Sequence, residues 1–205
     1  MACRRDRSGG MMGKIWNMPQ EGQDRRTKDM VIYRNIESEE LSRELFSHFI
    51  RRQEVVKCWR REGGEWVIRD APFIDDWSEE DYAFLVTCLK NTVQTGGFVY
   101  GAFLDGELKG FVSAEPGLFG GEHKYIDLSS IHVSEDMRGS GIGRTLFEAA
   151  KIWAKDQGAG KLYISAHSAV ESQAFYKKMG CREAELYHQG HVEAEPYDCQ
   201  LECPV

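Results

Sequence analysis

The chain has 205 residues, a length that predicts one domain of roughly 150 residues with at most an appendage. Hydrophobic residues make up 41% and charged residues 29% of the sequence, which is an ordinary globular composition and excludes collagen-like, coiled-coil and low-complexity chains. The 26 basic and 33 acidic residues give a formal net charge of −7. A broad nucleic-acid-binding surface is therefore not expected, and cationic small molecules would be favoured electrostatically.

Neither a membrane span nor a secretory signal is predicted. No segment approaches the ~18 consecutive apolar residues that a membrane helix needs, and the N-terminus lacks the apolar stretch of a secretory signal. We therefore expect a cytoplasmic protein without a membrane partner, whose six cysteines are reduced thiols. The cysteines include no C-x-x-C pair and no histidine at zinc-finger spacing, so no metal site is predicted.

The first 29 residues differ in composition from the remainder of the chain. They hold 7 basic and 4 acidic residues and show no apolar period. We expect residues 1–29 to form a disordered extension and residues 30–205 to form the folded domain. A basic arm that contacts an acidic surface or a nucleic acid is the alternative interpretation of this segment.

The pattern in the first half of the folded part predicts two helices. Leu41, Leu45 and Phe49 form an apolar stripe at helical spacing, and Ser78 followed by Asp81 resembles the capping box that opens a helix. The predicted elements are a strand at 30–33, a helix from 38 to about 52, an irregular region over 59–76 with at most a short strand at 66–68, and a helix from 78 to near 96.

The second half predicts an antiparallel meander followed by alternating strands and helices. Asp105-Gly106 between two apolar runs is a strong hairpin signal. The predicted elements are strands at 98–104, 107–115 and about 125–133, a helix from 141 to about 156, a strand at 161–166, a helix at about 171–179, and strands near 182–187 and 197–202. The fold class is therefore α/β of the α+β type, with a mixed, mostly antiparallel sheet flanked by helices.

A glycine-rich turn between a strand and an amphipathic helix is the most informative segment. It reads Arg138-Gly139-Ser140-Gly141-Ile142-Gly143. Glycines there let the backbone approach a ligand, and the unpaired N–H groups of the following helix favour a phosphate. A dinucleotide fingerprint fails because Leu146 stands at the third glycine position, and a phosphate-binding Walker loop fails because Arg144 replaces its lysine.

The turn matches the pattern Arg-x-x-Gly-x-Gly after a strand, and a second block of strand and short helix follows at 162–166 and 174–181. In these two blocks the sequence resembles the GNAT superfamily of acyl-CoA-dependent N-acyltransferases, over most of residues 30–205. Two blocks in the right order are more specific than either alone. The resemblance implies a sheet that is splayed at the acetyl-CoA site.

The resemblance also implies acetyl-CoA as co-substrate and gives the residues that would bind it. Backbone amides of the turn would hold the pyrophosphate, and a backbone N–H near His132 or Val133 would stabilise the oxyanion. The implied binding residues are His132, Val133, Arg138, Gly139, Ser140, Gly141, Ile142, Gly143, Arg144 and His167. The sequence departs from the family pattern at His167, where the family often has asparagine, and at Cys181, where an aromatic residue is common.

Acyl transfer to an amine needs a neutral amine, a stabilised oxyanion and a protonated leaving thiolate. The resemblance places Asp127 as the base and Tyr176 as the acid. A structural ion pair is the alternative role of Asp127, and packing on a half-buried helix face is the alternative role of Tyr176. Glu115 is the reserve base. A cysteine nucleophile is the rival mechanism, but no Cys/His spacing supports it.

The acceptor is expected to be a primary amine of a small molecule, attacked directly in a ternary complex. Aromatic residues and carboxylates alternate between Trp59 and Glu80, which suits a cationic amine, although an aromatic core under a solvated helix start explains the same pattern. Two other functions stay open: a protein or peptide acetyltransferase acting on lysines or N-termini, and a non-catalytic acyl-CoA-binding module. A homodimer is possible.

Overall fold

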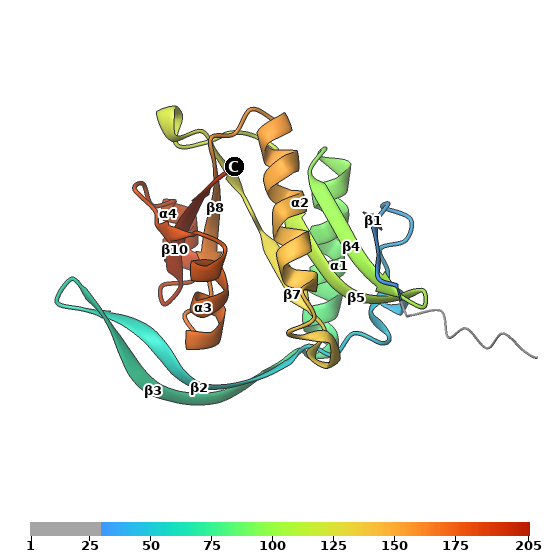
Figure 1. The fold of residues 1–205 in the computed structure, drawn as a ribbon, viewed down its shortest axis with the longest axis horizontal. Coiled ribbons are helices and arrows are strands. Elements are labelled where there is room, and N and C mark those ends of the chain that lie inside the picture. The colour runs from blue at the N-terminus through green and yellow to red at the C-terminus, as the bar shows by residue number, and fades with distance from the viewer. Residues whose placement is uncertain (1–29) are drawn as a thin grey trace, which may run out of the picture.

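The computed structural model describes residues 30–205, so the prediction for residues 1–29 lies outside the described part of the chain. Two four-stranded sheets form the framework (Figure 1). The first sheet is antiparallel, in the order β1 (Ile32–Asn35), β4 (Phe98–Leu104), β5 (Glu107–Ala114), β7 (Ser130–Val133). The second sheet has the order β6 (Tyr125–Asp127), β8 (Lys161–Ala166), β10 (Cys199–Pro204), β9 (Arg182–Glu183).

The two sheets separate at Leu128 and Ser129. The single strand expected at 125–133 is divided there: β6 pairs in parallel with β8, whereas β7 pairs with β5. The backbone N–H of Leu128 donates to the carbonyl of Tyr163 at 2.9 Å, and beyond this bond β7 and β8 diverge to leave a V-shaped gap (Figure 1). Each half of the segment follows a different partner strand, a choice that no local pattern specifies.

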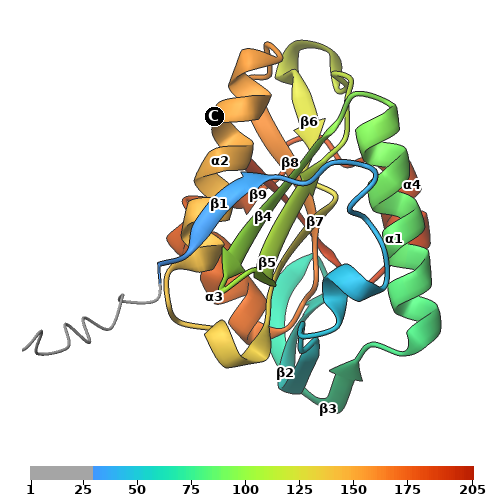
Figure 2. The same cartoon turned by 90° about the vertical axis from the view of Figure 1, so that its right-hand side faces the viewer.

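Helices cover both faces of the first sheet (Figure 2). α1 (Glu79–Gln94) packs on one face and begins at the predicted capping box, in which Ser78 accepts from Asp81 N–H. α2 (Ile142–Asp156) packs on the other face through apolar residues at helical spacing, among them Leu146, Phe147 and Ala150. α3 (Val170–Lys178) and the short α4 (Gln189–Ala194) accompany the second sheet.

The helix expected over 38–52 is wrong. Only Glu44–Phe46 form a short 3-10 helix, η1, and the surrounding chain is irregular. The apolar residues behind that prediction are nevertheless buried: Leu41, Phe46 and Phe49 belong to the core between this segment, α1 and the first sheet. The helical spacing of these apolar residues therefore reflects their burial in the core, although the segment lacks the regular backbone hydrogen bonds of a helix.

Residues 52–76 form a long hairpin, whereas the sequence predicted an irregular region over 59–76. β2 (Arg52–Glu62) pairs antiparallel with β3 (Glu65–Asp76) through a turn at Gly63 and Gly64, both at positive φ. The hairpin passes beneath both sheets (Figure 1), and the N–H of Trp59 donates to the carbonyl of Ser168 at 2.8 Å. Many of its residues are charged and exposed, so strand periodicity was absent from the sequence.

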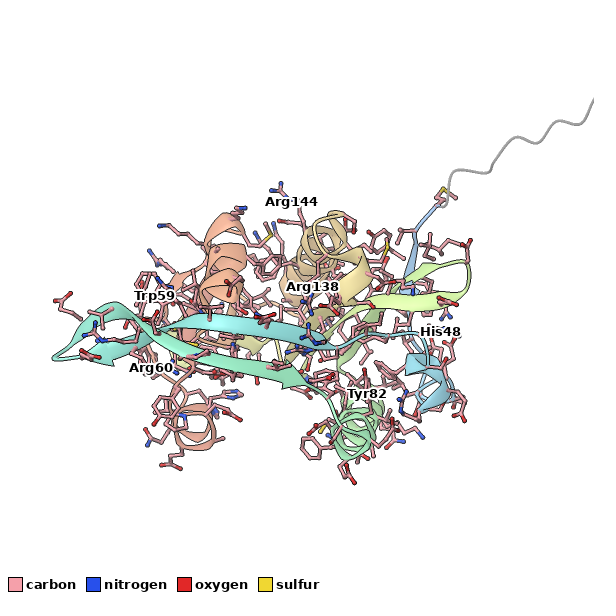
Figure 3. All side chains as sticks on the ribbon, turned by 90° about the horizontal axis from the view of Figure 1, so that it is seen from below. His48, Trp59, Arg60, Tyr82, Arg138 and Arg144 are labelled. Carbon is pink, nitrogen blue, oxygen red and sulfur yellow. The ribbon has the colours of Figure 1, made fainter. Side chains whose placement is uncertain are left out.

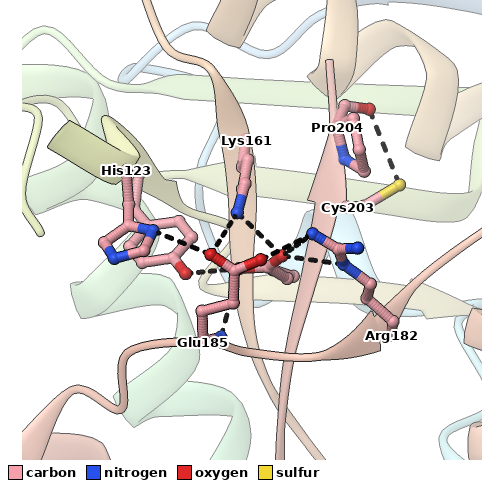
Figure 4. Close-up of polar contacts among 8 residues, drawn as sticks. His123, Lys161, Arg182, Glu185, Cys203 and Pro204 are labelled. Atoms are coloured by element: carbon pink, nitrogen blue, oxygen red, sulfur yellow. Dashed lines mark hydrogen bonds and ion pairs between the residues drawn. The ribbon is translucent and has the colours of Figure 1, made fainter.

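A buried carboxylate ties together all four strands of the second sheet. Glu202 in β10 is fully buried and accepts from Lys161 at 2.8 Å, from Arg182 at 2.9 Å, and from the hydroxyl of Tyr125 (Figure 4). Oxygen and nitrogen atoms of Glu202, Glu185 and His123 lie close enough to hold a metal ion. Because Lys161 and Arg182 already neutralise the carboxylates, we interpret the cluster as a structural ion-pair network.

The last predicted strands are shorter than expected or displaced. β9 ends at Glu183, α4 lies where the sequence indicated a loop, and β10 begins at Cys199. None of the helices in residues 30–205 is long and apolar enough to cross a membrane.

Candidate active site

The main cleft lies in the gap between β7 and β8 and has a volume of about 900 Å³. Its walls come from the strand gap, from the glycine-rich turn, from α3 and from the start of β2. Nine of the ten residues predicted to bind acetyl-CoA line it: His132, Val133, Arg138, Gly139, Gly141, Ile142, Gly143, Arg144 and His167. Ser140 is in the same turn but does not line the cleft, and its hydroxyl donates to the carbonyl of Met137 at 2.6 Å.

The glycine-rich turn has the backbone that its sequence predicted. Gly139 and Gly141 have φ values of +79° and +94°, and Gly141 is the N-cap of α2. Residues that carry a side chain rarely adopt this backbone conformation. The helix start that follows presents unpaired N–H groups toward the cleft. At Gly143 a side chain is disfavoured for a different reason, which is lack of space: an added Cβ would lie 3.3 Å from the ring of Phe175 in α3.

The two arginines of the turn lie differently. The guanidinium of Arg138 donates to the carbonyl of Arg52 at 2.5 Å and so joins the turn to the hairpin, whereas Arg144 points outward on α2 (Figure 3). Burial and the neighbouring charge of Arg51 lower the pKa of Arg138. The turn and the start of β2 therefore form one rigid, positively charged rim of the cleft.

β7 offers an unpaired edge to the cleft. Among residues 30–205 it is the last strand of the first sheet, with β5 on one side and no strand on the other. Alternate backbone N–H and C=O groups of such an edge face outward and can bind an extended ligand. Val133 packs on the side of α2, while the ring of His132 lies 4.8 Å from that of Trp77 on the side of α1. Burial, together with the charges of Arg51 and Arg138, lowers the pKa of His132 to about 3.

A second cavity, of about 370 Å³, lies on the α1 side of the first sheet. It is lined by residues of α1, β5 and β7, among them Asp81 and Glu115. Ser129, Ser130 and His132 line both cavities. The two cavities therefore meet at the point where the sheets separate.

The two candidate bases have different surroundings. Glu115 lines the second cavity and accepts from the hydroxyls of Thr92 at 2.7 Å and Ser129 at 2.8 Å. Asp127 lines neither cavity, and its Oδ2 lies 2.8 Å from Nε2 of His191. This hydrogen bond raises the pKa of His191. The backbone links the two candidates, since the N–H of Glu115 donates to the carbonyl of Asp127 at 2.9 Å.

Tyr176 in α3 is buried and lines the main cleft. Burial, and then the nearby charges of Cys181 and Asp198, raise the pKa of its hydroxyl. The phenol therefore stays protonated at neutral pH and can donate a proton or a hydrogen bond into the cleft.

The predicted aromatic acceptor region is only partly brought to the site. Trp77 lines the second cavity, but Trp59, Trp66 and Phe73 lie on the hairpin and line neither cavity. Arg51 and Ser129 also line the main cleft and were not predicted from the sequence. Ser129 carried no motif, and its role became visible only when the strand divided beside it.

Comparison with known proteins agrees with this geometry. The sequence profile of the acetyltransferase (GNAT) family matches residues 37–181. Comparison with curated protein sequences finds no significant match.

Solved structures share the fold. A nourseothricin acetyltransferase has a TM-score of 0.61 at 18% identity, covering 85% of this chain and 98% of its own. A streptothricin acetyltransferase, described as putative, from Bacillus anthracis in complex with acetyl coenzyme A has a TM-score of 0.63 at 15% identity, covering 86% and 98%. The PaiA N-acetyltransferase from Thermoplasma acidophilum in complex with coenzyme A has a TM-score of 0.55 at 18% identity, covering 86% and 99%. The chain belongs to the GNAT family of acetyltransferases.

Proposed function

We propose that this chain transfers the acetyl group of acetyl-CoA to a primary amine of a small molecule, by direct attack in a ternary complex. The observation that carries the proposal is the meeting of two cavities in the strand gap at Ser129, Ser130 and His132. The larger cavity has the phosphate-binding turn at one end, and the smaller has a carboxylate, Glu115, beside the junction. Donor and acceptor can therefore approach β7 from opposite sides.

In this proposal acetyl-CoA lies in the main cleft. The backbone amides at 139–143 and the N-terminus of α2 bind its diphosphate, and the free edge of β7 binds the pantetheine amides. A backbone N–H near His132 or Val133 stabilises the oxyanion. The neutral ring of His132 adds no charge there, so its contribution is to shape the junction.

The amine nitrogen attacks the thioester carbonyl, a C–N bond forms and the C–S bond breaks. Glu115 takes the N–H proton, directly or through the hydroxyl of Ser129, with which it shares a 2.8 Å hydrogen bond. Tyr176 gives its proton to the departing thiolate. Asp127, which the family resemblance put forward, stays a candidate for the base, but the geometry favours Glu115 because that carboxylate lines the acceptor cavity.

The test is CoA release from acetyl-CoA over a panel of polyamines, aminoglycosides, amino acids and peptides. We expect acetyl transfer to small amines, with kcat/KM for peptides lower by tenfold or more, because the acceptor cavity is only about 370 Å³. Preference for peptides would support the protein acetyltransferase alternative. Binding of acetyl-CoA without turnover on any amine would support the non-catalytic module.

The same assay separates the two bases. An alkyl amine with a pKa of about 10.4 is rarely neutral at pH 7, so removal of the base should matter most at low pH. We expect Glu115→Gln to lower kcat/KM by about 100-fold at pH 6 and by less at pH 9, with Asp127→Asn much milder. The reverse order of the two defects would assign the base to Asp127.

A further inference from the structure

Arg51, which immediately precedes β2, lines the main cleft and has two side-chain donors without a partner among the described residues. Its side chain is only 10% exposed, and its Nη2 is bonded to Asp75. Within residues 30–205 its Nε and Nη1 are buried and have no hydrogen-bond partner. A buried cation keeps such donors only where something compensates them. Because Arg51 lines the cleft, an anionic group bound there is the candidate partner for these donors.

Arg51 lines the main cleft and not the second cavity, but its contact with Trp77 extends to the acceptor side of β7. Successive side chains of a strand point to opposite faces: Val133 packs with α2, whereas His132 contacts Trp77. The guanidinium of Arg51 lies 5.1 Å from the ring centre of the same Trp77, which lines the second cavity. Arg51 also lies near Arg138 of the glycine-rich turn, and both arginines are close to His132, at which the two cavities meet.

The chain separates two charges of opposite sign along β7. Ser129 is hydrogen-bonded to Glu115, and His132 lies beside Trp77, which contacts Arg51. Ser129 and His132 are three residues apart, which is roughly 10 Å at about 3.3 Å per residue. An amine held at the Glu115 end can therefore extend a second, negatively charged group toward Arg51.

We propose that Arg51 binds a carboxylate of the acceptor, so that the acceptor is an amino acid whose reactive amine and carboxylate are separated by several methylene groups. This inference rests on the proposed acetyl transfer to a small amine. Arg51 then determines specificity, while the groups that move protons remain at the other end of the cavity.

The test uses acceptors that differ only by the carboxylate: 6-aminohexanoate against pentylamine, and lysine against cadaverine. For the wild type we expect kcat/KM to be about 10- to 100-fold higher for the carboxylated member of each pair. Arg51→Gln should abolish this preference, so that kcat/KM for the carboxylated member of each pair falls to that of its uncarboxylated partner. Arg51→Lys, which keeps the charge, should retain part of the preference.

Asp75→Asn is the matched control, because it removes the ion pair to Arg51 and keeps the guanidinium. It should keep the preference for the carboxylated acceptors, whereas an equal loss in Asp75→Asn and Arg51→Gln would reduce Arg51 to a structural role. A rise in KM for acetyl-CoA in Arg51→Gln, with both members of a pair equally affected, would assign the anion to a phosphate of the donor. No preference in the wild type would also overturn the inference.

Calorimetry on the full chain saturated with CoA separates this inference from the proposed function. Wild type should bind 6-aminohexanoate at least tenfold more tightly than pentylamine, and Arg51→Gln should not discriminate. Such binding without acetyl transfer would refute the proposed function and leave the carboxylate site standing. Acetylation of pentylamine by a protein that binds 6-aminohexanoate and pentylamine equally well would refute the carboxylate site and leave the proposed function standing.

Discussion

At the scale of single residues, the glycine-rich turn and Tyr176 are the positions whose substitution is most informative. Gly139 and Gly141 adopt positive φ next to the start of α2, and the hydroxyl of Tyr176 is kept protonated by burial. Both features are local. One concerns the backbone that would approach the diphosphate, and the other concerns one oxygen atom that would face the leaving group.

Gly141→Ala should weaken acetyl-CoA binding by about 1 kcal/mol or more, because a Cβ at a positive φ strains the turn and obstructs backbone approach. Gly158→Ala is the matched control: Gly158 has φ +84° and equally open surroundings, but lies just beyond the other end of α2. Calorimetric titration should show reduced affinity in Gly141→Ala only. Equal affinity in the two folded variants would mean that the turn does not hold the donor.

Tyr176→Phe removes only a hydroxyl, so it should lower kcat by about 10- to 1000-fold while acetyl-CoA affinity changes by no more than a few fold. Because the raised pKa keeps the phenol protonated, the defect should be nearly constant from pH 6 to pH 9. Tyr197→Phe, at a 68% exposed position, serves as control. Wild-type turnover in Tyr176→Phe, with the chemical step rate-limiting, would remove Tyr176 from the acid role.

At the scale of elements, the β2–β3 hairpin connects the two sides of the strand gap. At its start, the N–H of Ile50 donates to Ser134 Oγ at 2.9 Å beside the first sheet. Near its far end, Arg60 donates to Ser168 Oγ at 2.7 Å, and Arg61 pairs with Glu183 at 2.7 Å, beside the second sheet. A strap with this placement should fix the width of the cleft.

Val55→Asp should detach the hairpin, because Val55 is 1% exposed and packs in a small core with Cys58 and Ala169, where a carboxylate would have no partner. Val56→Asp is the control, since Val56 is 50% exposed on the opposite face of the strand. Hydrogen exchange of the amides at 52–76 should accelerate only in Val55→Asp, accompanied by a lower kcat/KM. Unchanged exchange in Val55→Asp would show that the hairpin is held elsewhere.

At the scale of the whole molecule, the two sheets hold together in different ways. The first is enclosed between α1 and α2 by two apolar clusters, the larger of which also includes residues of β6, β8 and β10. The second sheet adds to this apolar core the buried Glu202 and its contacts to β6, β8 and β9. Burial by itself would raise the pKa of Glu202, but hydrogen bonds from Lys161, Tyr125 and Arg182 outweigh it and lower the pKa to about 2.

Acid should therefore destabilise the protein partly through Glu202. Because the folded pKa of about 2 lies below the ordinary value of 4.5, the stabilisation is present above pH 4.5 and is lost as the pH falls toward 2. Glu202→Gln should lose roughly 3 kcal/mol of unfolding free energy at pH 7 and show a flatter decline between pH 5 and pH 3. Urea unfolding at several pH values measures both effects.

Glu122→Gln, at an exposed position, is the control and should follow the wild-type curve. A Glu202→Gln variant that unfolds with the wild-type free energy at pH 7 would show that the network contributes no net stability.

The sequence alone determined the features that are written in short stretches of chain. The capping box at Ser78, the hairpin at Asp105-Gly106 and the turn at 138–143 all have the predicted backbone. In each, the conformation depends on a few consecutive residues: a side chain that caps its own helix, or glycines that tolerate positive φ. The family resemblance and the proposed donor site both follow from such stretches.

Tertiary structure decided how distant stretches combine. Which strand the two halves of 125–133 join, and whether 52–76 pairs with itself, depend on partners that local periodicity does not encode. Glu115 meets Thr92 across 23 residues and Ser129 across 14, and Arg51 meets Asp75 across 24. The proposed acceptor side of the site consists of such contacts, because these charged side chains are brought together only when the sheets separate and the hairpin crosses beneath them.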